Sequence, residues 1–167
     1  MPEAVLCASL HEKIGEQIER SLHLIGLVPD ANLAWAPDPG AWTVGELLGH
    51  LLECMAGFCA VLAAAEPQRL AHFRELRELP VNHPCSPAEA AARIAIYRAH
   101  IEEGFALLTD ADLARRLATV FVAQGELLLT LLLGNLEHLI NHKHQLFTYL
   151  KQMGAPVATP DLYQFRI

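Results

Sequence analysis

Residues 125–154 form one long, strongly apolar stretch, and this stretch restricts the fold more than any other part of the chain. Its spacing predicts a single helix over residues 125–153, with Gly154 suited to the C-terminal cap. A helix this apolar must be mostly covered by other helices. One row of polar side chains nevertheless recurs along it every three or four residues: Asn135, His138, His142, Gln145 and Tyr149. This row faces either the interior of a bundle, where each polar group needs a partner, or solvent.

Three earlier segments also show helical spacing. Residues 2–27 carry apolar side chains every three or four positions, with charges between them. Thr43 and Glu46 form the pattern of a capping box, which predicts a second helix running to about residue 65. Ser86 and Glu89 form another, with proline at the first helical position, and predict a third helix to about residue 108.

The remaining segments are connections. Residues 66–85 contain three prolines and are expected to cross one end of the bundle, while residues 120–122 are a candidate for a short extended piece. Two prolines after residue 154 predict an extended tail that packs back through Leu162, Tyr163 and Phe165. The fold expected for residues 1–167 is therefore one all-α domain, a four-helix bundle with a long crossover connection and an extended C-terminal tail.

Charge and composition narrow the partners and the location. A net charge of -7 with no run of lysine and arginine disfavours nucleic acid as a partner. Residues 47–65 approach the length of a membrane span, but they include His50 and Glu53, so we expect a buried bundle helix and no membrane. The four cysteines show no CxxC spacing and the N-terminus lacks secretory signal features, which favours the cytoplasm.

His138 and His142 are the strongest candidates for chemistry. Residues four apart share a helix face, so both imidazoles can bind one metal ion. A chain with nine histidines produces such pairs by chance, and the spacing alone is therefore weak evidence. His50, from the second helix, is the side chain that can supply a third ligand across the bundle. Three nitrogens plus water is the arrangement of catalytic zinc, which lowers the pKa of bound water and can also bind a thiolate.

Four neighbours are candidates to support these ligands. Asn135 and Gln145 lie on the same polar row and can hydrogen-bond the imidazoles. Glu53 follows His50 by three residues and can orient it or act as a base, although a partly exposed charge is the favoured interpretation. Cys54, four after His50, is a candidate ligand or nearby thiol, although a small core residue is favoured there.

The sequence also resembles the DinB / YfiT-like family of metalloenzymes. The run from His138 to Gly154 is similar to that family's last-helix motif, His-x-x-x-His-Arg-Gly-Gln-Leu followed by an aliphatic run. Trp42-Thr-Val-Gly-Glu-Leu-Leu-Gly-His-Leu resembles its second-helix motif, and Pro160-Asp-Leu-Tyr its ending. Lys143 and His144 replace the usual Arg and Gly, and Asn141 stands where a further His is common. None of these departures removes a ligand, but they weaken any transfer of substrate specificity.

The resemblance implies that His50, His138 and His142 bind one divalent ion, nickel or zinc, in a bundle that is commonly a homodimer. It also implies relatives that transfer low-molecular-weight thiols such as bacillithiol or mycothiol, or isomerise maleylpyruvate with a thiol cofactor. Our first hypothesis is thus a metal-dependent enzyme of the thiol-S-transferase or hydrolase type acting on a small molecule, its general base unassigned.

Two other hypotheses remain open. One is a non-enzymatic dimeric metal-binding protein of the stress response, in which Cys54 or another group closes the fourth metal position. The other is a plain apolar bundle whose histidines are structural. A cavity beside the metal, lined partly by Trp35 or Trp42, would favour the enzyme.

Overall fold

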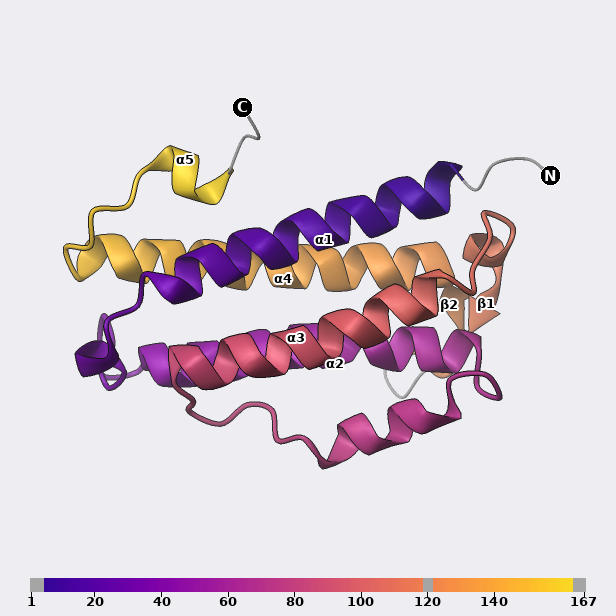
Figure 1. Ribbon diagram of the computed structural model, residues 1–167, viewed down its shortest axis with the longest axis horizontal. Helices are drawn as coiled ribbons and strands as arrows, with labels where there is room; N and C mark the ends of the chain where they lie inside the picture. Colours follow the sequence, from indigo (N-terminus) through magenta and orange to yellow (C-terminus); the bar gives the residue numbers. More distant parts are fainter. Residues whose placement is uncertain (1–4, 119–121, 164–167) are drawn as a thin grey trace.

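Four long helices lie side by side in the computed structural model, which describes residues 5–118 and 122–163 (Figure 1). They are α1 Val5–Gly26, α2 Val44–Ala65, α3 Pro87–Phe105 and α4 Leu128–Gln152. The described connections add three short 3-10 helices, η1 Asp30–Asn32, η2 Ala71–Glu78 and η3 Asp112–Ala114, and an antiparallel pair of two-residue strands, β1 Arg116–Leu117 and β2 Glu126–Leu127. The predicted all-α four-helix bundle is confirmed.

The order of the helices around the bundle explains the long crossover. α2 packs against α3 and α4, and α1 packs against the same two helices, so α1 and α2 lie diagonally opposite. α2 and α3 are neighbours that run in the same direction (Figure 1). The chain must therefore return along the whole bundle between them. Residues 66–86 run alongside the helices, with η2 in the middle, and the expectation that they cross one end is wrong.

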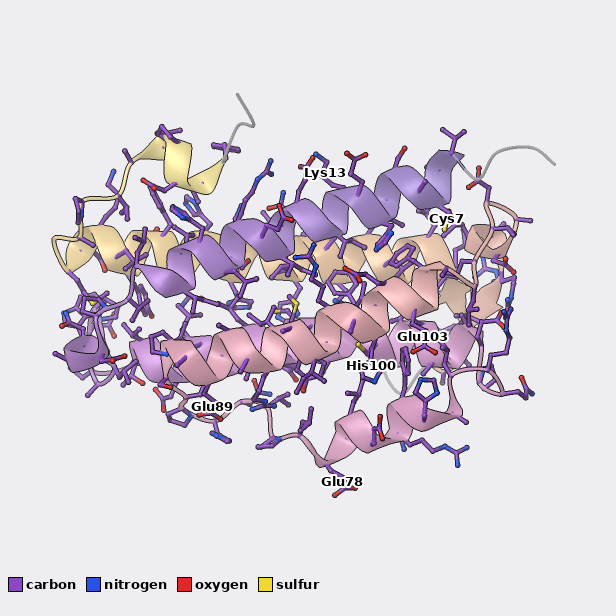
Figure 2. The ribbon with its side chains drawn as sticks, viewed as in Figure 1. Cys7, Lys13, Glu78, Glu89, His100 and Glu103 are labelled. Atoms are coloured by element: carbon purple, nitrogen blue, oxygen red, sulfur yellow. The ribbon has the colours of Figure 1, made fainter. Side chains whose placement is uncertain are left out.

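Apolar and polar contacts hold this crossover in place. Phe73 of η2 is buried against the core. The ring of His72 lies 3.0 Å from the Glu103 carboxylate of α3, and that of His100 lies 3.6 Å from Glu75. Figure 2 shows His100 and Glu103 on the side of α3 that faces η2. The crossover is thus attached to α3 in its first half as well as to α2.

Local capping explains where the helices begin and end. Thr43 and Glu46 form the predicted capping box at the start of α2. Ser86 accepts from the backbone of Glu89 as predicted, but the Glu89 carboxylate lies near Arg93, at 3.8 Å, and the structure shows no return bond to Ser86. At the end of α4, Gly154 has φ +80° and follows the last helical turn, a conformation that glycine adopts without strain.

The tail differs in part from its prediction. It is extended over residues 155–158 and then forms α5, the single turn Thr159–Leu162, which packs on α1. Pro160 does not prevent this turn because it lies in the first turn, where a missing N–H costs nothing. Leu162 is buried, whereas Tyr163 is half exposed. Phe165, and Val120 and Phe121 of the expected extended piece, lie outside the described residues.

α2 supplies the largest share of the buried core. Its side chains with no exposure include Leu47, Leu48, Leu51, Leu52, Met55, Phe58 and Leu62. Among the helices that the structure describes, α2 alone is long and apolar enough to span a membrane by length and composition. It packs between α3 and α4, which is how the core helix of a soluble bundle lies.

Gly49 provides a test of the packing between α2 and the crossover. A Cβ at Gly49 would overlap with the backbone carbonyl of His83, so the two segments must separate in Gly49→Ala. We expect a loss of about 2 kcal/mol or more in the free energy of unfolding, measured by urea denaturation. The control Gly15→Ala in α1 meets no atom within 4 Å and should gain about 0.5–1 kcal/mol. Equal stability of the two variants would contradict this packing.

Candidate metal centre

Three histidine rings meet between α2 and α4. His50 lies in the second turn of α2, and His138 and His142 lie one turn apart on α4. The Nε2 atom of His50 is 3.0 Å from that of His138 and 3.1 Å from that of His142. All three ligand atoms lie within 4.8 Å of one another, and the three residues are half-buried. The structure therefore brings together the three residues that the sequence singled out.

This spacing suits a single metal ion. Three nitrogens at ~2.0–2.1 Å from a tetrahedral zinc lie about 3.3 Å apart, close to the separations found here. Within the described part of the chain, the cluster has three histidine ligands and no cysteine or carboxylate among its members. A tetrahedral ion held by these three nitrogens would keep one position for a water or a substrate atom.

The hydrogen bonds of the Nδ1 atoms, which face away from the cluster, explain why the Nε2 atoms inside it favour a cation. Nδ1 of His142 lies 2.9 Å from Oε1 of Gln145, and Nδ1 of His50 lies 2.7 Å from Oδ1 of Asn82. Because both partners are acceptor oxygens, each Nδ1 carries the proton and donates it. The Nε2 atoms of His50 and His142 are then both unprotonated, and their lone pairs face each other at 3.1 Å. A positive ion between them removes this repulsion.

Burial keeps two of the rings in the form that binds metal. It lowers the pKa of His138, and the neighbouring His50 acts in the same direction. It also lowers the pKa of His142, against the opposing effect of its hydrogen bond to Gln145. A pKa below the usual value near 6.5 means that these imidazoles stay neutral at pH 7, which metal ligation requires.

Glu53 and Gln145 lie where the sequence placed them in relation to the ligands. The Glu53 carboxylate lies 3.0 Å from Nδ1 of His50, the ring nitrogen whose hydrogen bond goes to Asn82. The Glu53 side chain is 41% exposed and thus remains open to solvent on its other side. Gln145 donates from Nε2 to the hydroxyl of Tyr149, at 3.2 Å, which fixes the orientation of its amide.

Asn135 and Cys54 lie elsewhere. Asn135 donates to the backbone carbonyl of Cys54, at 2.8 Å, and packs against Gly57, so it joins α4 to α2 and does not orient an imidazole. The thiol of Cys54 points into the core with no exposure, and burial raises its pKa to about 12. A protonated core thiol is a poor metal ligand, and Cys54 is not a member of the histidine cluster.

Aromatic side chains from the loop before α2 cover one side of the centre. The ring of Trp42 lies 4.4 Å from that of His50 and 5.6 Å from that of His142, between ring centroids. Trp42 remains 41% exposed, so it borders the solvent side of the histidines. Trp35 packs edge-on against Tyr149 at 5.4 Å and reaches the centre only through Gln145.

Asn82 is the contact that the sequence did not predict. It lies in the crossover, with φ 57°, in a segment without helical or strand periodicity. An asparagine between two prolines is a weak turn signal and carries no information about a ring that lies 32 residues earlier.

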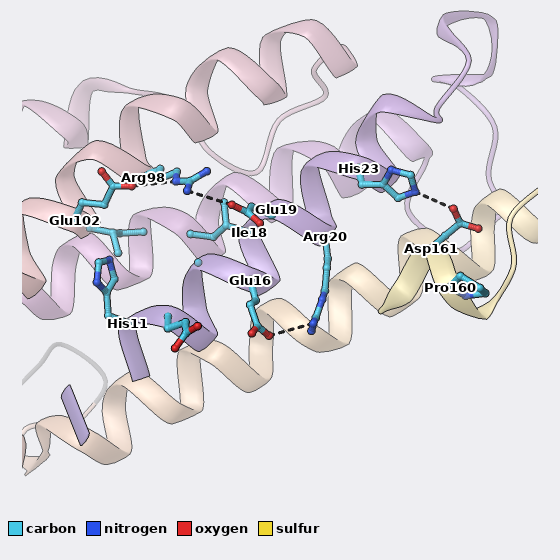
Figure 3. A pocket seen from close by; sticks show the side chains of 13 residues that line it. His11, Glu16, Ile18, Glu19, Arg20, His23, Arg98, Glu102, Pro160 and Asp161 are labelled. Carbon is cyan, nitrogen blue, oxygen red and sulfur yellow. Dashed lines mark hydrogen bonds and ion pairs between the residues drawn. The ribbon is translucent and has the colours of Figure 1, made fainter. Parts of the chain in front are cut away.

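A separate groove of about 950 Å³ lies between α1, α3 and α5, on the opposite face of the bundle (Figure 3). Its charged side chains pair with one another: Arg98 with Glu19 at 3.4 Å, Arg20 with Glu16 at 3.0 Å, and His23 with Asp161 at 2.8 Å. Such pairs satisfy one another and do not form a convergent ligand set. The candidate site is therefore the histidine cluster.

Comparisons with known proteins agree with this assignment. A family model described as the DinB superfamily matches residues 14–146. Among solved structures, a DinB-like protein from Bacillus subtilis is 18% identical with a TM-score of 0.66, over 87% of this chain and 92% of that one. A DinB-like protein from Bacillus cereus is 17% identical with a TM-score of 0.67, over 89% and 95%. No curated protein matches the chain.

Metal analysis of single variants tests the cluster. We expect purified wild type, reconstituted with Zn²⁺ or Ni²⁺ and freed of excess ion, to hold about one ion per chain. His50→Ala and His142→Ala each remove one of three ligands and should lose most of that metal. His144→Ala is the matched control, because His144 is exposed on α4 and packs on Phe147 away from the cluster. Unchanged metal content in both ligand variants would rule out this centre.

Proposed function

The chain belongs to the DinB superfamily, and from this premise we propose that it is a metal-dependent enzyme of the thiol-S-transferase or hydrolase type. The proposed cofactor is one divalent ion, zinc or nickel, bound by His50, His138 and His142. A low-molecular-weight thiol is the proposed second cofactor for the transferase reaction. The substrate is a small electrophilic molecule.

The observation that carries this proposal is a set of three converging ligands with no fourth protein ligand in the described cluster. A centre of this kind favours catalysis because one metal position is left for a reactant. When bound, the ion would lower the pKa of a coordinated water or thiol and so raise its nucleophilicity. A described cluster without a cysteine or carboxylate also argues against the non-enzymatic stress-response alternative, in which Cys54 or another group closes the fourth metal position.

The chain's own residues would prepare this centre for a reactant. Gln145 holds the ring of His142 and Asn82 holds the ring of His50, so the Nε2 atoms of both rings point into the cluster. The indole of Trp42 shields one side of the two rings from water and offers an apolar wall to the organic part of a substrate. Glu53, which is 41% exposed, lies 3.0 Å from Nδ1 of His50 and would help to orient that ring.

Activity with defined nucleophiles tests the proposal. The reconstituted protein should consume small electrophiles, such as epoxides or activated halides, faster with bacillithiol or mycothiol than without a thiol. A hydrolase should instead consume esters or amides without any thiol. In either case, His138→Ala should lower kcat/KM by at least about 100-fold, because the nucleophile loses its activation. Metal-loaded protein that is inactive with every nucleophile would favour the non-enzymatic alternative.

A homodimer is the second part of the proposal. Leu133 is 46% exposed and Ile140 is 37% exposed, and both lie on the outer face of α4. These two large apolar side chains lie on the side of α4 that faces away from the histidines, and they are suited to contact a second copy. Light scattering should give a mass near twice 18.4 kDa, and Leu133→Glu combined with Ile140→Glu should reduce it to one chain. A monomeric wild type would remove this part without affecting the metal centre.

A further inference from the structure

The last part of the crossover, residues 79–85, lies directly on the first turns of α2. The backbone N–H of Asn82 donates to the carbonyl of Gly49, at 3.1 Å, and that of Cys85 donates to the carbonyl of Gly45, at 3.2 Å. Both acceptors are glycines, and a Cβ at Gly49 would overlap with the crossover backbone. The sequence thus provides a track of small residues on which this segment docks.

Asn82 connects this docked segment to the candidate metal centre. Its φ of 57° lies in the left-handed region, which asparagine tolerates better than most residues. In this conformation its N–H bonds to α2 while its Oδ1 reaches Nδ1 of His50, at 2.7 Å. The opposite nitrogen of that ring is the one that faces the other two histidines. One residue therefore holds both the crossover and a ligand.

Glu53 and Asn82 both lie beside Nδ1 of His50, but they approach it from different segments. The Glu53 carboxylate comes from α2 itself, three residues away. It remains beside the ring whether or not the crossover is docked. Asn82 can orient the ring only while residues 79–85 lie on α2, because the acceptor belongs to that segment.

We propose that Asn82 is a positioning residue that couples docking of residues 79–85 on α2 to metal affinity at the histidine cluster. The inference rests on the proposed metal centre. It adds that metal affinity depends on the docking of a segment that contains none of the three ligands. Coupling of this kind is reciprocal, so the ion should also hold the crossover on α2. Most of the segment is only partly buried, which makes local release accessible without unfolding of the bundle.

Two substitutions at Asn82 separate the side chain from the backbone. Asn82→Gly keeps the left-handed conformation and removes the acceptor, whereas Asn82→Asp keeps an acceptor oxygen in the same place. Zn²⁺ affinity, measured by competition with a chelator, should fall about 10–100-fold in Asn82→Gly and should stay within about threefold of wild type in Asn82→Asp. Circular dichroism checks that both variants fold.

Amide hydrogen exchange distinguishes coupling from a purely structural role of Asn82, because only coupling makes the exchange of residues 79–85 depend on Zn²⁺. Saturating Zn²⁺ should slow amide exchange of residues 79–85 in wild type but not in Asn82→Gly. Gln145→Leu is the matched control, because it removes the acceptor of His142 on α4 and leaves the crossover contact intact. It should bind Zn²⁺ more weakly and yet, once saturated, protect residues 79–85 as wild type does.

The outcomes distinguish this inference from the proposed function. Wild type that binds no Zn²⁺ overturns both. Wild type that binds Zn²⁺, with Asn82→Gly equal to it in affinity and in protection of residues 79–85, overturns the coupling and leaves the metal centre standing. Loss of affinity in Asn82→Gly and Asn82→Asp alike would also overturn it, because the acceptor oxygen would then not be the cause.

Discussion

The close contact between α2 and α4 is the constraint on which the candidate site depends. Gly57 has no side chain, so Asn135 fits against α2 and donates to the carbonyl of Cys54 at 2.8 Å. This part-buried polar contact restricts the rotation of the two helices about each other. With that rotation set, His50 and the pair on α4 project toward one point. A shift of one residue in either helix would turn the rings apart by about 100°.

Rigid support of the rings distinguishes this cluster from a chance group of surface histidines. Two of the three Nδ1 atoms have hydrogen-bond acceptors, Gln145 on α4 and Asn82 in the crossover, and the Glu53 carboxylate of α2 lies 3.0 Å from one of them. Burial favours the neutral rings at the same time. The histidine and carboxylate pairs at η2, in contrast, attach the crossover to α3. Histidine thus has two roles in this bundle. It forms the cluster between α2 and α4, and it joins the crossover to α3.

Local features of the sequence were sufficient for the helices and for the histidine pair on α4, because their signals span only a few residues. The spacing of His138 and His142, the capping box at Thr43 and the glycine after α4 each act within one turn. Contacts between distant segments left no such signal. The path of the crossover, the contact of Asn82 with His50, and the bond of Asn135 to α2 all depend on packing. Asn135 lies three residues before His138, a spacing that allows a hydrogen bond to the ring, but its side chain packs beside Gly57 of α2.

The packing of α4, the last of the four long helices, against α2 has a consequence for synthesis of the protein. His50 and His142 are separated by 92 positions, and the helix that completes both the core and the cluster follows the other three long helices in the sequence. Until α4 has been made, the nascent chain carries α2 with the face meant for α4 uncovered, which is the kind of surface that chaperones recognise. The three histidine rings can therefore converge only after α4 has been made and has packed on α2.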